Sequence, residues 1–425
     1  MATDSQTTDV PFHQQFTCFL GFDWAYDHHD VVALDGPGRI LLDLRLEDTA
    51  EGWAHLRRQL LERVGPDLGR TAVAVETCNG PAVERLLGLG CAVFPINPKA
   101  AERYRERKAP MGAKSDRLDA WSFADALRTD GHGWRRLVSD DPLTQELRIL
   151  CRDEIALIQQ RTALVCQLKQ ALHEYYPAAL EAFEDWVNDG AWAFVAAFPT
   201  PSALVQAGKR RWEKFLHAHK LYRPETYLRR LAVFARANAF TAGAGITAGK
   251  SRLALALVAQ LQVLQKQLGL YRKAIEALFD RHPDRDIFGS LPGAAEKLAP
   301  RLLAELGDNR QRFDDAQGLQ CYAGSAPVTK ASGRRRVVFF RTGCNKVLRS
   351  TVHLWADQSR KKCLWAQVYY EHKREEGKSH ACALRCLAQR WLKIVWKMWQ
   401  TRSVYDPDLH MRNQVKHGSW VVQPA

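Results

Sequence analysis

The pattern of apolar and polar positions divides the chain into three parts. Residues 16–138 contain short apolar runs that alternate with amphipathic stretches, a pattern typical of strands alternating with helices. The expected order is three strands, a helix, a strand, a helix, a strand and a helix, which predicts an α/β domain with a mixed sheet. The predicted strands are 16–24, 30–35, 39–46, 71–78 and 91–98, and the predicted helices are 49–65, 80–90 and one that begins near Asp116.

This order of elements is that of a ribonuclease-H-like domain, with helices on both faces of its sheet. The basic stretch KAAERYRERKAPMGAK, residues 99–114, leads into the last helix of the domain. We expect this stretch to be mobile.

Residues 139–284 form a predicted helical linker. Apolar residues between 257 and 278 recur at alternating spacings of four and three, the pattern of a coiled-coil seam. An earlier helix, around residues 143–173, has Leu150, Leu157 and Leu164 seven apart. The two helices could pair within one chain or between chains, and the seam favours an oligomer as the active form. Its members are Leu257, Leu261, Leu264, Leu268, Tyr271, Ile275 and Leu278.

Residues 285–405 form a predicted, mainly helical C-terminal domain. It opens with SLPGAAEKLAPRLLAELGD, residues 290–308, a Pro-Gly turn followed by a helix. This segment is either a helix-hairpin-helix element, whose turn amides contact a phosphate backbone, or an ordinary turn and helix. The loop VTKASGRRR at 328–336, a short strand and basic helices follow. Residues 1–15 form an N-terminal extension, and residues 406–425 a tail that we expect to lack regular structure.

The positive charge of the chain is concentrated near its C-terminus. The net charge is +14, and residues 330–402 alone hold 18 lysines and arginines against four acids, so the rest of the chain is close to neutral. A basic region attached to a neutral body indicates a polyanionic partner, of which nucleic acid is the first candidate. A solvated basic face is the alternative.

Composition also narrows the cellular location. No apolar run approaches the length of a membrane span, and the N-terminal MATDSQTTDVPF lacks the basic and apolar regions of a signal peptide. Ten cysteines without a secretion signal indicate reduced thiols. We therefore expect a cytoplasmic, nucleoid-associated protein with no membrane partner.

Four carboxylates stand where the first domain would bring them together. Asp23 ends the first strand, and Glu76 ends the strand that follows the first helix. Asp116 and Asp119 lie three apart on the last helix and therefore share one side of it. Clustered carboxylates repel one another unless cations lie between them, and hard oxygen ligands suit Mg²⁺ or Mn²⁺. Two such ions stabilise the attacking and leaving oxygens in a phosphodiester displacement.

Each acid alone has a simpler explanation. The helix dipole favours an acid such as Asp116 in the first turn. Asp119 can pair with Lys114 or Arg117 on the surface, and Glu76 can be an isolated charge at a strand end.

Zinc is a competing possibility near the C-terminus, because cysteine and histidine bind it. The candidate ligands contain no C-x2-C pair, and the last two share one face of a predicted helix. These candidates are Cys363, His372, His380, Cys382 and Cys386.

The motifs that carry the acids resemble a known family. GFDWA, VETCN and KSDRLDA resemble the DEDD-type N-terminal domain of a class of bacterial insertion-sequence transposases, a domain similar to the Holliday-junction resolvase RuvC. The second half resembles the signature blocks of the C-terminal transposase domain of the same family, in the same order. These blocks are LPGAAEKLAPRLLAELGDNRQRF, LQCYAGSAPVTKASGRRR and GCNKVLRSTVHLWA. The resemblance covers about residues 16–135 and 285–360.

The resemblance implies a recombinase. Members of this family resemble site-specific recombinases that are guided by a structured RNA encoded in the element, the bridge RNA. The implied substrates are a donor and a target double-stranded DNA. A serine of the C-terminal domain is the implied nucleophile and forms a covalent phosphoserine link, with Mg²⁺ held by the four acids beside it. The implied assembly is a homo-oligomer, a dimer or a tetramer, in which acids from one subunit meet the serine of another.

The implied nucleophile maps to Ser332, in the SG pair that follows the G-x-x-P block, and Ser325 in YAGSAP ranks second. Arginines beside Ser332 can bind phosphate and stabilise charge in the transition state. From the residues alone, a serine before glycine in a basic loop is usually a turn residue. The predicted nucleic-acid-binding residues are Lys114, Lys330, Arg334, Arg335, Arg336, Arg341, Lys346 and Arg349.

Two other functions stay open at this point. In a metal-dependent nuclease or junction resolvase, the four acids would suffice and Ser332 would be structural. In a non-catalytic nucleic-acid-binding protein, neither the acids nor the serine would react.

Overall fold

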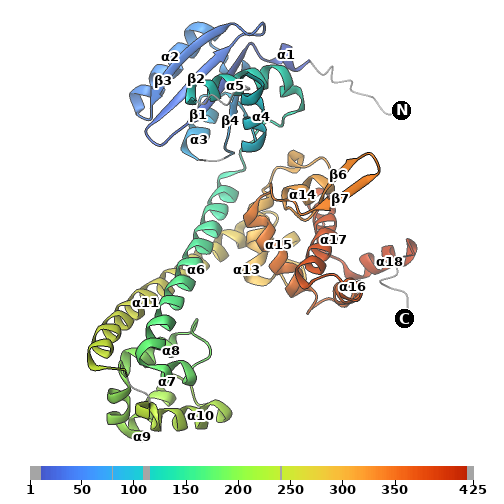
Figure 1. The fold of residues 1–425 in the computed structure, drawn as a ribbon. Helices are drawn as coiled ribbons and strands as arrows, with labels where there is room; N and C mark the ends of the chain where they lie inside the picture. Colours follow the sequence, from blue (N-terminus) through green and yellow to red (C-terminus); the bar gives the residue numbers. More distant parts are fainter. Residues whose placement is uncertain (1–10, 79, 109–114, 240–241, 419–425) are drawn as a thin grey trace. The chain divides into compact units, whose positions relative to one another are not determined.

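The chain divides into two compact units, Met1–Ser139 and Asp140–Ala425, in a computed structural model that describes residues 11–78, 80–108, 115–239 and 242–418 (Figure 1). The first unit is a mixed α/β domain, as the sequence predicts. Its strands are β1 (Cys18–Trp24), β2 (His28–Leu34), β3 (Ile40–Glu47), β4 (Thr71–Val75) and β5 (Ala92–Pro95). Its helices are α1 (Phe12–Gln15), α2 (Ala50–Val64), η1 (Leu68–Arg70), α3 (Pro81–Gly88), α4 (Pro98–Lys108), α5 (Asp116–Asp130) and η2 (Gly131–Gly133).

The five strands form one sheet in the order β3-β2-β1-β4-β5. β1 pairs antiparallel with β2 and parallel with β4, so the predicted neighbourhood of the two acid-bearing strands is confirmed. Apolar side chains project from both faces of the sheet. One face packs against α2 and α3, through residues such as Trp53 and Leu86, and the other packs against α4 and α5, through residues such as Ala101 and Phe123.

Most of the basic stretch at 99–114 is helical, a structure that the sequence analysis did not predict for it. Its first ten residues belong to α4, which packs against α5, and residues 109–114 lie outside the described part. Tyr104 contacts the Trp134 ring at 6.0 Å, and Arg105 pairs with Asp119 on α5. Tertiary contacts therefore stabilise a helix that its charges alone do not predict.

The second unit is mostly helical, with one two-stranded sheet of β6 (Val328–Ser332) and β7 (Arg335–Phe339). Its first helices are α6 (Pro142–Tyr175), α7 (Pro177–Ala182), α8 (Asp189–Ala197), α9 (Pro201–Ala218), α10 (Pro224–Ala235), η3 (Ala237–Ala239) and α11 (Ala244–Arg281). The remaining helices are α12 (Arg285–Gly289), α13 (Ala295–Leu306), η4 (Arg310–Arg312), α14 (Ala316–Tyr322), α15 (Lys346–Ser359), α16 (Leu364–Glu375), α17 (His380–Thr401) and α18 (Pro407–Lys416).

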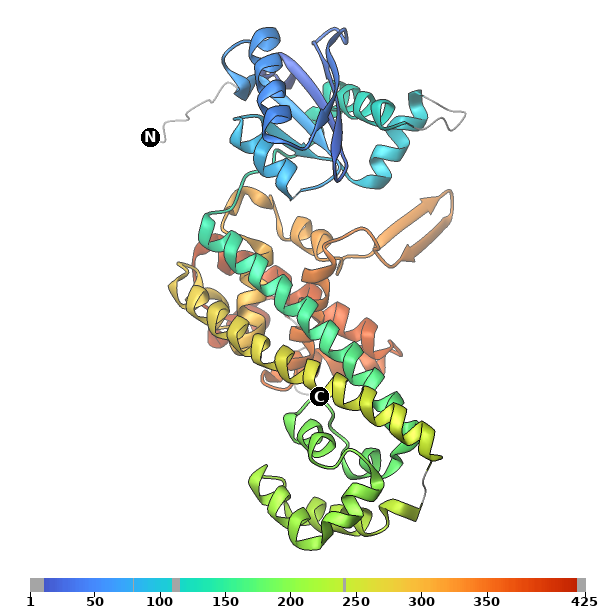
Figure 2. The same cartoon turned by 90° about the vertical axis from the view of Figure 1, so that its left-hand side faces the viewer.

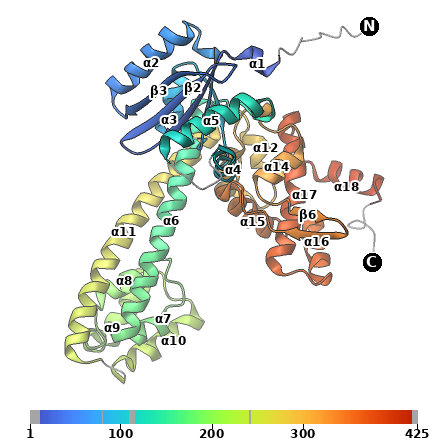
Figure 3. The same ribbon diagram turned by 45° about the horizontal axis from the view of Figure 1, so that its top comes forward.

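The long helices α6 and α11 pair with each other inside this one chain (Figure 3). Leu147 near the start of α6 shares a core with Ile275 near the end of α11, and Leu168 shares a core with Leu257, so the pair is antiparallel. Leu150, Leu157 and Leu164 are only partly buried, and Leu150 and Leu164 pack at the edges of the two cores, so the predicted heptad on α6 is not its most buried face. Because α6 covers the leucine seam of α11, the seam gives no argument for an oligomer.

Helices α7 to α10, residues 177–235, pack around one end of the α6–α11 pair (Figure 1). Their core is aromatic: the rings of Phe194 and Phe234 stack at 5.0 Å, and Trp192 is fully buried.

Within the residues that the structure describes, α11 is the one helix whose length and composition would allow it to cross a membrane, contrary to our expectation from the sequence. This is weak evidence, because the core helix of a soluble protein can pass the same test. A third of the most apolar stretch of α11 is buried in the protein, and Leu261 and Leu268 are fully buried.

Two further segments differ from the sequence prediction. Residues 328–332, predicted as loop, form strand β6, and part of the tail forms helix α18, whose first turn is capped by Asp406. The Pro-Gly turn before α13 packs on α15, where the indole nitrogen of Trp355 donates a hydrogen bond to the carbonyl of Pro292 at 3.0 Å. Because α12 precedes this turn and α13 follows it, both of our alternatives stay open.

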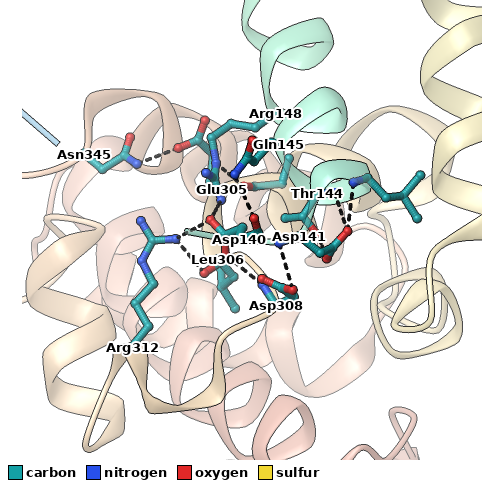
Figure 4. A network of polar contacts seen from close by, with 12 residues as sticks. Asp140, Asp141, Thr144, Gln145, Arg148, Glu305, Leu306, Asp308, Arg312 and Asn345 are labelled. Carbon is teal, nitrogen blue, oxygen red and sulfur yellow. Dashed lines mark hydrogen bonds and ion pairs between the residues drawn. The ribbon is translucent and has the colours of Figure 1, made fainter. Parts of the chain in front are cut away.

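A polar clasp holds the start of α6 to the loop after α13 (Figure 4). The amide of Asp141 donates to the Asp308 carboxylate at 3.2 Å, and the amide of Asp308 donates to the Asp140 carboxylate at 3.1 Å. Arg148 and Arg312 pair with Asp140 and offset part of this negative charge. These hydrogen bonds hold the first residues of the second unit, Asp140 and Asp141, against the loop after α13.

Candidate active site

The predicted acids of the first unit lie on one face of the sheet. Side chains of a strand alternate between its faces, and Gly21 of β1 faces α5, so Asp23 two residues later is on the same face. Glu76 follows β4 in the same phase as Ala72 and Ala74, whose side chains also pack on the α4 and α5 side. Helix α5 crosses this face.

Helix α5 approaches β1 unusually closely because Gly21 has no side chain. A Cβ added at Gly21 would lie 1.8 Å from the carbonyl oxygen of Ala120 and 2.7 Å from the amide nitrogen of Ala124. Ala120 is the neighbour of Asp119, so this contact sets the position of Asp119 beside the end of β1. The Ser115 side chain caps the helix and accepts a hydrogen bond from the Leu118 amide at 3.2 Å.

The carboxyl of Asp23 shows that the acids converge. Burial and four nearby carboxylates raise the pKa of Asp23 to about 7. In decreasing order of effect these carboxylates belong to Asp119, Asp116, Glu76 and Asp30. All four predicted acids are therefore close enough to interact through their charges.

Asp30 is a further acid of this cluster that the sequence analysis did not identify. It lies directly opposite Asp23 in the pairing of β1 with β2 and is 5% exposed. Ligand atoms of His28, Asp30 and Asp116 lie within 4.8 Å of one another, a group that could hold a metal ion. The sequence signal was the polar run HHD at the start of a strand that is otherwise apolar.

Two arginines contribute positive charge to the cluster. Arg45 of β3 donates to Asp30 at 2.8 and 3.3 Å, and one of its nitrogens is 3.7 Å from Asp116. Arg105 of α4 donates to both oxygens of Asp119, at 2.9 and 3.2 Å. Arg117, one of the two surface partners considered for Asp119, instead pairs with Asp43.

The donor set fits a hard divalent cation. It consists mainly of carboxylate oxygens from β1, β2, α5 and the end of β4, with one imidazole from His28. Because these carboxylates repel one another around Asp23, bound positive charge would stabilise their ionised forms.

Ser332 lies in the second unit, at the tip of the β6–β7 hairpin (Figure 2). It pairs with Arg335 across a two-residue turn, in which Gly333 has a φ of +54°, a conformation that favours glycine. Ser332, Arg334, Arg335 and Arg336 are all exposed. No ion pair among the described residues involves these three arginines, so their charges are available to a ligand.

Ser325, the second candidate, has a structural role. Its hydroxyl donates to the carbonyl of Gln320 at 3.2 Å in the turn that ends α14. The structure therefore separates the two serines, one exposed among arginines and the other bound to the backbone of a helix end.

The other predicted nucleic-acid-binding residues fall into two groups. Lys330 and Lys346 are exposed. Arg341 donates to the Ala326 carbonyl at 3.1 Å, and Arg349 donates to the Arg341 carbonyl at 3.0 Å, so these two arginines hold the loop around the hairpin together. Lys114 lies outside the described residues.

Among the described residues, the five cysteine and histidine candidates for zinc do not form a group of potential metal ligands. The part of the chain that the structure describes contains one group of potential metal ligands, the one around Asp30, and none of the five candidates belongs to it. Cys363 instead lies 3.9 Å from the Tyr405 hydroxyl, and His380 contacts the Tyr370 hydroxyl at 2.7 Å. A cavity of about 640 Å³ between α17 and α18 contains none of the predicted site residues.

Comparison with known proteins places both halves of the chain among transposases. Residues 20–177 match a transposase model for the DEDD domain of IS110, and residues 285–371 match a model described as transposase, IS116/IS110/IS902 family. The first match contains the four acids, and the second contains Ser332.

Individual relatives agree over nearly the whole length. A Streptomyces coelicolor protein named for the transposase of the IS117 mini-circle is 35% identical over 408 residues, which cover 93% of this chain and 97% of the relative. An uncharacterised protein of insertion element IS900 from Mycobacterium paratuberculosis is 32% identical over 400 residues, 90% of this chain and 95% of the relative. An IS110 protein from Streptomyces coelicolor is 27% identical over 400 residues, 91% and 95% of the two chains.

The chain therefore belongs to the IS110/IS116/IS902 family of insertion-sequence transposases, which are enzymes of DNA recombination.

Proposed function

We propose that this transposase cuts and rejoins DNA through Ser332, assisted by Mg²⁺ or Mn²⁺ held by Asp23, Glu76, Asp116 and Asp119. The observation that carries the proposal is the convergence of carboxylates around Asp23, whose pKa is raised to about 7 by burial and by these neighbours. The strand order agrees with a ribonuclease-H-like, RuvC-like first domain. The basic charge of the second unit agrees with DNA as its substrate.

The acids have a defined task in this proposal. When bound, the metal supplies positive charge for the oxygens of the reacting phosphodiester. Asp23 releases the proton that its raised pKa lets it keep near neutral pH, because a carboxylate ligand must be ionised. Asp119 and Asp116 present their oxygens from one side of α5, which the close contact at Gly21 holds against β1.

Ser332 has the exposure that an attacking group needs. Its oxygen forms a bond to phosphorus while one ester bond of the DNA breaks, the hydroxyl proton passes to a base, and the leaving oxygen is protonated. Arg334, Arg335 and Arg336 bind the phosphate and stabilise its charge. In the proposed oligomer, the serine of one subunit meets the acids of another.

Two serine variants test this proposal. Ser332→Ala should abolish the covalent protein–DNA adduct, and Ser325→Ala, the matched control in the same region, should leave adduct formation intact. The adduct is measured by denaturing electrophoresis of labelled DNA substrates, and the modified residue is identified by mass spectrometry. If Ser332→Ala still cleaves DNA at the wild-type rate, the hydrolytic nuclease is correct and the serine is structural.

We further propose that a structured bridge RNA encoded in the element guides this enzyme, which would act in the bacterial cytoplasm at the nucleoid. The exposed basic residues of the second unit would contact backbone phosphates, and base pairing outside the protein would supply sequence specificity. Sequencing of RNA that co-purifies with the protein expressed from its native locus tests this partner. A discrete RNA from the flanking non-coding region is expected, and random cellular RNA would contradict the guided function.

A further inference from the structure

Asp119, one of the four proposed metal ligands, already has a cationic partner. One guanidinium nitrogen of Arg105 lies 2.9 Å from one oxygen of the Asp119 carboxylate and 3.2 Å from the other. The side chain of Asp119 is 9% exposed and that of Arg105 is 22% exposed. The arginine therefore covers the carboxylate from the side of α4.

We infer that Arg105 is an internal counter-charge that competes with the divalent metal for Asp119. The inference rests on the metal site of the proposed function. A metal that uses Asp119 must displace Arg105 or accept a positive charge beside it, and both cost free energy. Arg105 thus sets the metal concentration at which the acid cluster loads.

The cluster needs such a counter-charge when no metal is bound. Asp30 lies opposite Asp23 in the strand pairing, and ligand atoms of Asp30 and Asp116 lie within 4.8 Å of each other, so the ionised carboxylates repel one another. Arg105 offsets this repulsion at Asp119, and Arg45 offsets it at Asp30 and, from 3.7 Å, at Asp116. Arg105 lies on α4 and Arg45 on β3. Of these two arginines, Arg105 is the one that contacts a proposed metal ligand at hydrogen-bond distance.

Arg105 can leave Asp119 without detaching its helix. Arg107, two residues further along α4, binds Asp125 at 3.2 Å and lies 3.9 Å from Asp130, and both of these acids belong to α5. These pairs and the contact of Tyr104 with Trp134 anchor α4. Arg105 therefore needs only a change of rotamer, for which its partial exposure leaves room.

The test compares Mn²⁺ binding by the full-length wild type, Arg105→Gln and Arg107→Gln, measured as free Mn²⁺ by electron paramagnetic resonance in the absence of DNA. Arg105→Gln should bind Mn²⁺ about tenfold more tightly than the wild type, since it removes a cation from the site. Arg107→Gln, which removes an equal charge from the same helix but not from the cluster, should bind as the wild type does. Arg105→Lys, which keeps the charge, should stay close to the wild type.

The outcomes separate the inference from the proposed function. Unchanged or weaker Mn²⁺ binding by Arg105→Gln, with normal binding by the wild type, would overturn the inference alone. In that case Arg105 would orient Asp119 or only stabilise the fold. If Asp119→Asn and the wild type bind Mn²⁺ equally, or neither binds it, both the inference and the proposed metal site are wrong.

Discussion

Asp308 is the carboxyl group whose pKa rises where three acids, Asp140, Asp141 and Asp308, pack closely together. Burial and hydrogen bonds with the carboxyls of Asp140 and Asp141 raise the pKa of Asp308 to about 7. Against the effect of burial, hydrogen bonds from Asp308, Thr144 and the Leu143 amide lower the pKa of Asp141 to about 2. Asp308, Arg148 and Arg312 lower the pKa of Asp140, which burial would raise. With a pKa of about 7, the Asp308 carboxyl keeps its proton below neutral pH, where it can share hydrogen bonds with Asp140 and Asp141.

These shifts have opposite effects on stability. The raised pKa of Asp308 means that its contribution to stability is full below pH 4 and is lost as the pH rises through about 7. The lowered pKa of Asp141 gives a contribution that is present above pH 4 and is lost as the pH falls through about 2.

Asp308→Asn should therefore be more stable than the wild type at pH 8, by about 1 kcal/mol after allowance for solvent screening, and similar to it at pH 4. The amide cannot ionise but can still donate to the acids of the clasp. Urea unfolding at the two pH values measures the difference. Asp141→Asn, which weakens the cap of α6, should instead lower stability at pH 8. A loss of stability at pH 8 in Asp308→Asn would show that its charge is stabilising.

At the scale of single residues, the sequence indicated which acids lie close together, but it did not indicate the other residues that contact them. Asp23 and Glu76 could be predicted together because both end apolar strands that the order of elements makes neighbours. Asp30 could not, because its place depends on the register of β1 with β2, which sets Asp30 opposite Asp23. The link between Arg105 and Asp119 joins helices that only the tertiary fold brings together.

At the scale of elements, the contact of α5 with β1 is the feature on which the acid cluster most depends. Gly21→Ala should push α5 away from the sheet, because the new methyl group would meet backbone atoms of Ala120 that cannot move alone. We expect a loss of about 2–3 kcal/mol in stability together with weaker Mn²⁺ binding. Thermal unfolding and Mn²⁺ titration measure the two effects.

Gly36→Ala is the matched control for this substitution. An added Cβ at Gly36 meets no other atom within 4 Å, so its effect should be within about 0.5 kcal/mol. Equal stability and equal Mn²⁺ affinity in Gly21→Ala and the wild type would show that the position of α5 does not control the acids.

The mispredicted elements share a physical cause. Helix α4 is rich in charge, and its helix depends on pairs with α5 that a local pattern does not reveal. On α6, the spacing of seven selected Leu150, Leu157 and Leu164, whereas the buried face includes Leu147, Cys151 and Glu154. Glu154 belongs to this face because Arg272 and Arg301 pair with it, so a hydrophobic pattern misses it. Strand β6 is exposed and polar and therefore resembles a loop.

At the scale of the whole molecule, the chemistry is divided between two units. The acids belong to the unit that ends at Ser139, and Ser332 belongs to the unit that begins at Asp140. The excess positive charge also belongs to the second unit. The sequence analysis placed the acids and Ser332 in different domains, but it separated the helical linker from the C-terminal domain, whereas both lie in one compact unit. It could not reveal that the seam of α11 is covered within the chain, because a heptad pattern does not identify its partner.

The central claim, that a divalent metal is held by the four acids Asp23, Glu76, Asp116 and Asp119, is tested most directly by anomalous X-ray scattering from crystals of the full chain grown with Mn²⁺. The account predicts an anomalous peak bounded by Asp23, Glu76, Asp116 and Asp119, with Arg105 turned away from Asp119. An ordered peak that involves only His28, Asp30 and Asp116, or no peak in the cluster at saturating Mn²⁺, would contradict it.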